Sequence, residues 1–567
     1  MEITSRRKVL GGAFLVGLLL IASGIVLDLV VFPAAIRSRI LENVQLRRGS
    51  DAMERFIRLP QPIVLRVFLF NVTNPHEVYL GKSPPKLQEI GPYSYHIYRE
   101  KVEMEEDLGS DTLSFYQISQ YFFRRELSIG DEDDLVTVLN VPMLGLINQA
   151  TKSLPITPPF FSSVVQDLFT DPAEKYSSSY KFMPFLKSSV RKLLFEGVPI
   201  RCGKPRAFFT GYIGKTLLCT GIGMNLPQSM RKAEEDDRAN KGNYLFSFLG
   251  YKNNSREGPA VVRRGMKKPE EVGQVLFWKG QTEMKSWGPS ADPSNPCNKV
   301  VGIDASTFAP FVSEKSVIKV FQPELCRPVS AVFEKEVEFR GIPAMRFVAD
   351  IDLFATPDVK PENWCYYPTG DDTKRDQYWS TIETGVQDLS ACLGAPIVVS
   401  FPHFYGASSN YLKYAKGLHP EKSLHETYVE IESMTGSPLN AAKKLQFNMY
   451  LKRDARFPFL WNVTEGLFPV MWAEEGMKLD DKFSRMLKEE LFDVINILKI
   501  IKWTMISVGV LEIIAVLIFA RSRWMSKKED SADQKLKEAN LCYEMSKKSI
   551  PYGIAESKEK EADKPPT

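Results

Sequence analysis

The sequence lacks an excess of charge of either sign. Lys and Arg together number 73, and Asp and Glu 69, among 567 residues, which gives a formal net charge of +4. Proteins that bind nucleic acids usually concentrate basic residues, so this balance argues against a nucleic-acid partner. Aromatic residues make up 11% and apolar residues 44% of the chain. The chain is therefore not expected to be disordered over most of its length.

Motifs of metal and nucleotide chemistry are also missing. The five histidines never form an H-x-x-x-H pair, and no C-x-x-C or G-x-S-x-G motif occurs, so neither a zinc site nor a serine nucleophile is predicted. Residues 211–216 partly match a phosphate-binding loop, but Phe209 stands where that loop needs its first glycine. Glu474 and Glu475 are interpreted as solvated or ion-paired rather than as glycosidase carboxylates. No catalytic residue, metal site or cofactor is predicted, and the protein is not expected to be an enzyme.

Long apolar runs are few, and a mean hydropathy of −0.19 argues against a polytopic membrane protein. The first run, residues 9–31, contains one charge, Asp28, and follows Arg6, Arg7 and Lys8. It is long enough to cross a hydrocarbon core of about 30 Å. It also exceeds the apolar core of about 7–15 residues that a cleaved signal peptide has. A retained transmembrane helix is therefore favoured over a signal peptide.

The second run, residues 501–521, has basic residues on both sides. Glu512 lies at its centre, where a carboxylate that faces lipid would cost about 3 kcal/mol. We interpret this side chain as protonated and packed against the first span rather than as a functional group. Small residues let two spans approach closely, and the first span offers Gly11, Gly12, Gly17 and Gly24.

Two terminal spans with basic flanks predict cytoplasmic segments at 1–8 and 522–567 and an extracellular or lumenal ectodomain at 32–500. The charged C-terminal tail is predicted to be disordered. Six of the seven cysteines lie in the ectodomain, as expected for three disulfides in an oxidising compartment, although their spacing does not choose the pairs. The sequons at Asn71, Asn253 and Asn462 lie there too and predict a glycoprotein.

The ectodomain combines strand and helix patterns. A mostly apolar run at 63–70, followed by a turn, and alternating apolar and polar residues at 333–339 and 444–452 predict half-buried antiparallel strands. Apolar residues at 160, 161, 164, 165 and 168 predict one helix, and a second helical stripe runs from Phe182 to Leu194. These patterns predict an α+β fold in which a helical insert at about 141–200 interrupts a β-rich body.

Several segments together resemble the class B scavenger receptor family over nearly the whole chain. They are NVTNP at 71–75, GPYSY at 91–95, TFAPF at 307–311, LCR at 325–327, FPHFY at 401–405 and KLQFN at 444–448. Within that family the chain is most similar to the insect sensory neuron membrane proteins, through LFEG at 194–197 and PVMWAEEG at 469–476. The resemblance implies an antiparallel β-barrel core, an apical helical bundle and an internal apolar tunnel.

The resemblance also implies disulfide pairs. By position, Cys297 would pair with Cys365 and Cys326 with Cys392. Cys202 and Cys219 match a pair of the sensory branch, and Cys542 stays free. A further short-range bridge that the family often has is absent, since residues 366 and 367 and the loop after them contain no cysteine.

Two kinds of function follow from the resemblance. The first is a plasma-membrane lipid receptor or co-receptor, which takes fatty-acid-derived pheromones or related long-chain lipids from a soluble carrier and passes them to the membrane or an odorant receptor complex. The second is a general scavenger receptor for lipoproteins, anionic lipids or apoptotic cells, or a trafficking or adhesion receptor that binds protein at the apex. For ligand capture we predict cationic and apolar residues of the helical insert: Lys175, Lys181, Phe182, Phe185 and Leu186.

Overall fold

The computed structural model describes residues 2–153, 161–171, 183–203, 209–224, 226–234, 241–287, 295–367 and 382–547. The chain forms two units. One combines residues 1–37 with 488–567, and the other is the ectodomain body, residues 38–487.

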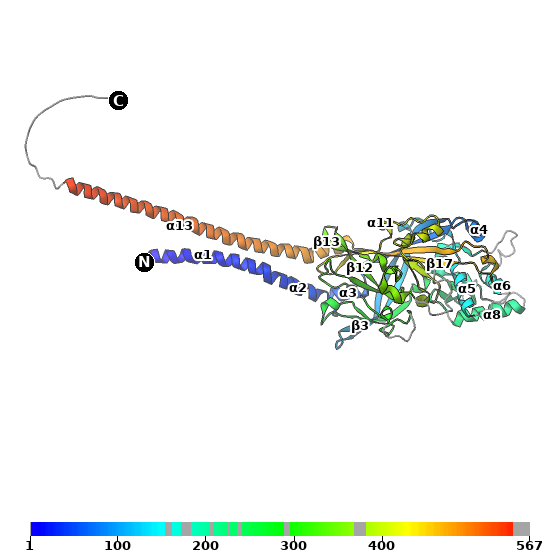
Figure 1. Ribbon diagram of the computed structural model, residues 1–567. Coiled ribbons are helices and arrows are strands. Elements are labelled where there is room, and N and C mark those ends of the chain that lie inside the picture. The colour runs from blue at the N-terminus through cyan, green and yellow to red at the C-terminus, as the bar shows by residue number, and fades with distance from the viewer. Residues whose placement is uncertain are drawn as a thin grey trace, which may run out of the picture. The chain divides into compact units, whose positions relative to one another are not determined.

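The first unit consists of two long apolar helices (Figure 1). Helix α1 spans Glu2–Val26 and continues through a π-helical turn, Leu27–Val31, into α2, Phe32–Asn43. Pro33 explains this turn, because proline lacks an N–H group and its ring crowds the carbonyl four residues earlier. Helix α13 spans Val494–Lys547. Both helical segments are long and apolar enough to cross a membrane.

The two helices of this unit pack through glycine. A Cβ atom on Gly17 would lie 2.9 Å from the carbonyl oxygen of Gly509, and one on Gly24 would lie 3.0 Å from Ile506 Cγ1. By contrast, Gly11 and Gly12 have no neighbour within 4 Å of such an atom. Two of the four glycines predicted to mediate this contact therefore do so, and each meets a residue of α13.

The C-terminal tail differs from the prediction of disorder over 522–567. Helix α13 continues without a break to Lys547, and residues 548–567 lie outside the described part. All side chains from 521 to 545 are exposed, so the segment buries no apolar surface. Helix formers such as Lys, Glu, Ala and Leu dominate it, and they extend a helix that the span has already nucleated.

The ectodomain body is built on one large antiparallel sheet that is nearly closed into a barrel. Within the described residues its main path runs β10-β9-β3-β2-β1-β18-β17-β16-β13-β12-β11. In that order the strands span Val275–Trp278, Arg256–Arg263, Thr112–Phe123, Leu87–Asp107, Ile63–Val72, Gly466–Lys478, Pro438–Leu451, Tyr428–Ile431, Ile342–Ala349, Arg327–Phe339 and Ile318–Gln322. Ile303 forms bridges with Gln274, just before β10, and with Val320 of β11. Barrels remove exposed strand edges, and this segment spans the remaining gap.

The three predicted strands are present, but the third is not half-buried. On β17 the apolar side chains of Leu445 and Met449 are buried, as expected, yet the alternating polar side chains of Gln446 and Asn448 are fully buried as well. The Asn448 amide donates hydrogen bonds to the carbonyl of Val398 and the hydroxyl of Ser400. Strand β15 (Val398–Ser400) pairs with this part of β17. Its residues accept hydrogen bonds from a polar side chain that the sequence pattern predicts to face solvent.

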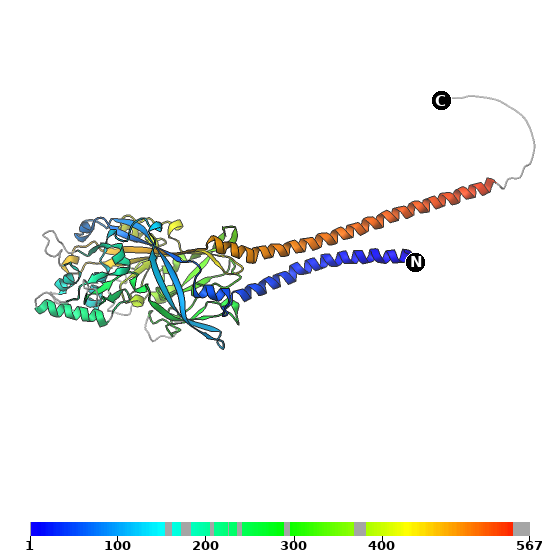
Figure 2. The ribbon, with the colours of Figure 1, turned by 180° about the vertical axis from the view of Figure 1, so that it is seen from behind.

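The helical insert is real but its predicted limits are wrong. Helices α5 (Val141–Ser153), α6 (Phe161–Phe169) and α8 (Phe209–Met224) lie together at one end of the barrel in both views (Figures 1 and 2). The second stripe is helical only in its second half, at residues 190–196, because Phe185–Ser189 forms strand β5 and pairs with β4, Leu135–Leu139. A partner strand distant in sequence overrides the local helical spacing. The region also contains a small sheet of β6 (Val198–Ile200), β7 (Met230–Lys232) and β8 (Tyr244–Phe246).

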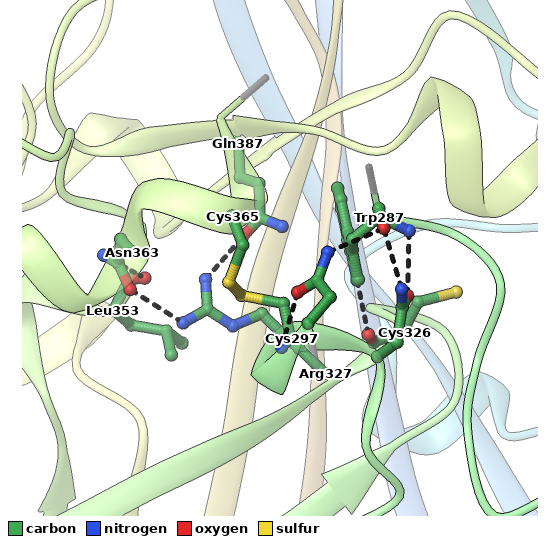
Figure 3. Close-up of a disulfide and its surroundings, with 10 residues drawn as sticks. Trp287, Cys297, Cys326, Arg327, Leu353, Asn363, Cys365 and Gln387 are labelled. Carbon is green, nitrogen blue, oxygen red and sulfur yellow. Dashed lines mark hydrogen bonds between the residues drawn. A yellow bond between two sulfur atoms is a disulfide. The ribbon is translucent and has the colours of Figure 1, made fainter. Parts of the chain in front are cut away.

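Three disulfides join the pairs that the resemblance implies: Cys202–Cys219, Cys297–Cys365 and Cys326–Cys392. Cys542 is free and exposed. Figure 3 shows how buried polar groups surround the second bridge. The Arg327 guanidinium donates hydrogen bonds to Gln387 and Asn363 at 2.7 and 3.2 Å. The second and third disulfides thus belong to a second core, mostly within residues 284–405, whereas Cys202 and Cys219 pack against the main core.

Candidate functional site

The barrel encloses a cavity of about 290 Å³. Its wall takes residues from strands around the whole circumference of the sheet, from β10 through β1 to β11. Most of the wall is apolar, with Phe115, Val275 and Phe321 as examples. A concave, largely apolar space with a few polar groups is the usual form of a small-molecule site.

A second cavity of about 170 Å³ lies where the barrel meets the helices. Helix α5 contributes Val141 and Leu146, helix α8 contributes Ile222, and β17 contributes Phe447 and Met449. This cavity is also lined mainly by aliphatic and aromatic side chains. The helical insert therefore roofs an apolar space that continues from one end of the barrel.

The two cavities share part of their walls. We call the shared set the waist, and it consists of Tyr121, Lys252, Glu324, Lys443, Leu445 and Glu475. Arg99 lines the first cavity beside it. Four of the six waist residues carry formal charge, whereas the walls on either side are mostly apolar. The waist is thus a polar constriction between two apolar chambers.

The charged groups of the waist are paired with one another. Lys252 Nζ lies 2.8 Å from Glu324 Oε1. Lys443 Nζ and Arg99 Nη2 each lie 3.1 Å from Glu475 Oε2. Paired charges are the usual form in which ionised groups survive burial.

The pairing sets the protonation of these groups. Burial by itself would raise the pKa of the Glu475 carboxyl, but the charges of Lys443 and Arg99 outweigh it and lower the pKa to about 2. For Glu324, burial is again opposed, here mainly by Lys252, which holds the pKa of that carboxyl well below its usual range. Both carboxylates are therefore ionised at any physiological pH.

Glu474 and Glu475 are ion-paired, one of the two outcomes expected from sequence. They point to opposite faces of β18, since successive side chains of a strand alternate. Glu474 contacts Arg66 and lies 3.8 Å from Lys444 Nζ, outside the cavity walls. Two carboxylates on opposite faces of one sheet cannot flank one glycosidic bond.

The residues predicted for ligand capture fall mostly outside the described part. Lys175, Lys181 and Phe182 lie within 172–182, which the structure does not describe. Phe185 and Leu186 lie on β5 and line neither cavity. Phe185 instead packs against Phe468, with ring centroids 5.9 Å apart.

The remaining sequence candidates have clear environments. Residues 211–216 form part of helix α8, so they do not form a phosphate-binding loop. Within the described ranges, no group of three or more His, Cys, Asp or Glu side chains could hold a metal ion.

Of the sequon asparagines, Asn462 is exposed, while Asn71 and Asn253 are half-buried. The side-chain oxygens of Asn71 and Asn253 accept hydrogen bonds from the backbone N–H groups of Thr137 and Tyr121, respectively.

No sequence motif predicted the waist, because its residues come from five separate segments of the chain. One feature of the sequence could have indicated it. On β17, Lys443 shares the face of Leu445 and Phe447, and on β18, Glu475 shares the face of Met471 and Ala473. A charge on the apolar face of a strand is unusual and points to a buried pair or a site.

Comparison with known proteins agrees with the fold. The sequence profile of the CD36 family, the family of the class B scavenger receptors, matches residues 15–520. Sensory neuron membrane protein 1 of Apis mellifera is 32% identical over 503 residues, covering 87% of this chain and 88% of that protein. Sensory neuron membrane protein 2 of Anopheles gambiae is 29% identical over 544 residues, covering 89% and 91%. Sensory neuron membrane protein 2 of Manduca sexta is 31% identical over 503 residues, covering 87% and 90%. With two apolar terminal helices, a nearly closed barrel and a profile match over most of its length, this chain is a membrane protein that belongs to the CD36 family.

Proposed function

We propose that this protein is a lipid receptor or co-receptor whose ectodomain takes up long-chain ligands and passes them through its two cavities to the membrane or to a partner receptor. The observation that carries this proposal is the pair of apolar cavities that meet at one waist. The names of the relatives favour a sensory role, so fatty-acid-derived pheromones are the ligands to test first. An odorant receptor complex and a soluble carrier are the corresponding partners.

The physical basis of such binding is burial of the alkyl chain. Each methylene group removed from water contributes about 0.8 kcal/mol. A cavity with few polar groups therefore discriminates by chain length and by branching more strongly than by head group. Members of a homologous series should differ in affinity up to the length that the cavities hold.

The proposal includes an orientation in the membrane. Both termini would lie in the cytoplasm of a plasma-membrane protein, with the body 38–487 outside the cell, where the three disulfides are stable. Glycosylation at Asn71, Asn253 or Asn462 would support this orientation. Enzymatic removal of N-glycans from the full chain, followed by mass spectrometry of these three sites, tests it.

A substitution that fills the first cavity tests the lipid-binding proposal. Ala331 lines the first cavity, and the next residue of β12, Val332, is exposed. Ala331→Phe in the full chain should weaken binding of labelled methyl palmitate by about tenfold or more, because the added ring occupies space that the ligand needs. Val332→Phe adds the same bulk outside the barrel and should leave binding unchanged. Equal affinity in both variants and in the wild type would rule out ligand binding in this cavity.

A further inference from the structure

The waist interrupts an otherwise apolar path with charged groups, and a ligand made only of hydrocarbon gains nothing from them. Resting on the proposed function, we infer that the waist binds the oxygen head group of a long-chain acyl ligand, while the alkyl tail occupies one of the two cavities. The head group of this ligand class is a carbonyl or carboxylate oxygen, that is, a hydrogen-bond acceptor.

The hydrogen-bond inventory of the waist favours an acceptor. The Arg99 guanidinium carries five N–H groups, and its described hydrogen bond goes from Nη2 to Glu475. Its Nε atom is buried and has no hydrogen-bond partner among the described residues. A buried N–H group without a partner is costly. The Arg99 side chain lines the first cavity, so a ligand oxygen there would meet its remaining guanidinium N–H donors.

The carboxylates of the waist, by contrast, leave no buried oxygen without a partner among the described residues. Glu475 receives both Arg99 and Lys443, and Glu324 receives Lys252. A cationic or purely donor head group would therefore meet no buried acceptor that lacks a partner. An acceptor head group meets donors in excess, because the ammonium groups of lysine carry three N–H donors each.

The balance of charge suits neutral as well as acidic head groups. Three cations and two carboxylates form the cluster around the waist, and Glu257 adds a further carboxylate to the wall of the first cavity. The surplus is therefore one of hydrogen-bond donors rather than of net charge. An ester or aldehyde carbonyl meets the same donors as a carboxylate, so the site selects for an acyl oxygen rather than for an anion.

A head group fixed at the waist also defines the position from which the length of the alkyl tail is measured. The tail then extends either past Phe115 and Phe321 into the barrel cavity, or past Phe447 and Met449 toward helix α5. The number of carbons counted from the carbonyl, rather than the total length of the molecule, would decide whether the tail fits.

Positional photolabelling of the unaltered full chain tests this assignment. Two palmitic acid analogues carry a diazirine either beside the carboxyl carbon or at the far end of the chain. The first should label peptides that contain Arg99, Tyr121, Lys252 or Lys443, and the second should label cavity-wall peptides away from the waist. Labelling of the waist by the tail-end probe, with the head probe reacting elsewhere, would overturn the assignment.

A pair of arginine variants provides the second test. Arg99→Gln removes the guanidinium donors that line the first cavity, whereas Arg66→Gln breaks a comparable ion pair, that with Glu474, on the other face of the same sheet. Arg99→Gln should weaken palmitic acid and methyl palmitate by about ten- to a hundredfold and leave hexadecane unchanged. Arg66→Gln should leave all three unchanged.

The outcomes separate the two proposals. Unchanged affinity of acid and ester in Arg99→Gln would overturn the head-group assignment while lipid binding stands. Failure of all three ligands to bind the wild type would overturn lipid binding itself and the assignment with it. Because the photolabelling uses the unaltered chain, it decides the question even if Arg99→Gln does not fold.

Discussion

Gly17 and Gly509 lie back to back where helices α1 and α13 pack. A Cβ atom on Gly17 would lie 2.9 Å from the Gly509 carbonyl oxygen, and one on Gly509 would lie 2.7 Å from that of Gly17. Only glycine permits this approach, since a contact below 3 Å is prohibitive for a methyl group and backbone. Close backbone packing of this kind holds helices together in lipid, where no hydrophobic effect drives their association.

We expect Gly17→Leu to separate the two spans. The introduced side chain would collide with the Gly509 backbone, whereas Gly12→Leu, at a position with open space, serves as a matched control. Cysteines at positions 24 and 506, where Gly24 faces Ile506, report the separation by disulfide cross-linking. Cross-linking should fall in Gly17→Leu and persist in Gly12→Leu. Unchanged yield in both would contradict the packing.

The shortest disulfide loop should contribute measurably to stability. Cys202 and Cys219 are 17 residues apart and tie the segment after β6 to helix α8. Replacing both by serine should lower the free energy of unfolding by about 3 kcal/mol in the chain-entropy model. Cys542→Ser, which alters a free and exposed thiol, is the control. Denaturant unfolding of the full chain measures the difference, and equal midpoints would show that the bridge is dispensable.

The buried imidazole of His425 should make the ectodomain less stable in acid. Its Nδ1 accepts a hydrogen bond from the Glu421 backbone N–H at 2.8 Å, which requires that nitrogen to be unprotonated. Burial, reinforced by the neighbouring His403, lowers the pKa of His425 from 6.5 to about 4. Between about pH 6.5 and pH 4, His425 is therefore protonated in the unfolded chain but not in the folded chain. Stability present above about pH 6.5 is lost as the pH falls to about 4, by about 3 kcal/mol.

His425→Asn keeps an acceptor oxygen in this region but cannot take up the proton. Urea unfolding between neutral pH and about pH 4 should show a flatter dependence of stability on pH for this variant than for the wild type. His76→Asn, at an exposed position, should retain the wild-type slope. If His425→Asn kept that slope as well, the acid sensitivity would have to reside elsewhere.

Capture of anionic ligands by the helical insert is a separate prediction. Charge reversal of Lys175 and Lys181 together should weaken binding of a fatty acid at low salt and matter less at high salt, because surface charges are screened. The methyl ester of the same acid should be affected much less, since burial of its chain provides most of its affinity. Equal binding of both ligands to wild type and variant would leave this region with a packing or protein-docking role.

Local sequence determined those features that need no distant partner. The 19 uncharged residues from Val9 to Leu27 are helical. The mostly apolar run 63–70 and the alternation along 333–339 suffice to predict strands. The number of cysteines available for disulfides and the existence of a helical insert followed from composition and spacing alone. The resemblance added the pairing of the cysteines and the closure of the sheet.

Tertiary structure decided the features that depend on a partner far along the chain. Residues 185–189 have helical spacing but form a strand, because β4 offers backbone hydrogen bonds to them. Asn448 looks solvent-facing but is fully buried, because β15 covers it. The waist shows the same principle most clearly. Lys443 and Glu475 stand on neighbouring strands in register, and only that register brings their charges together inside an apolar barrel, where burial makes the pairing obligatory.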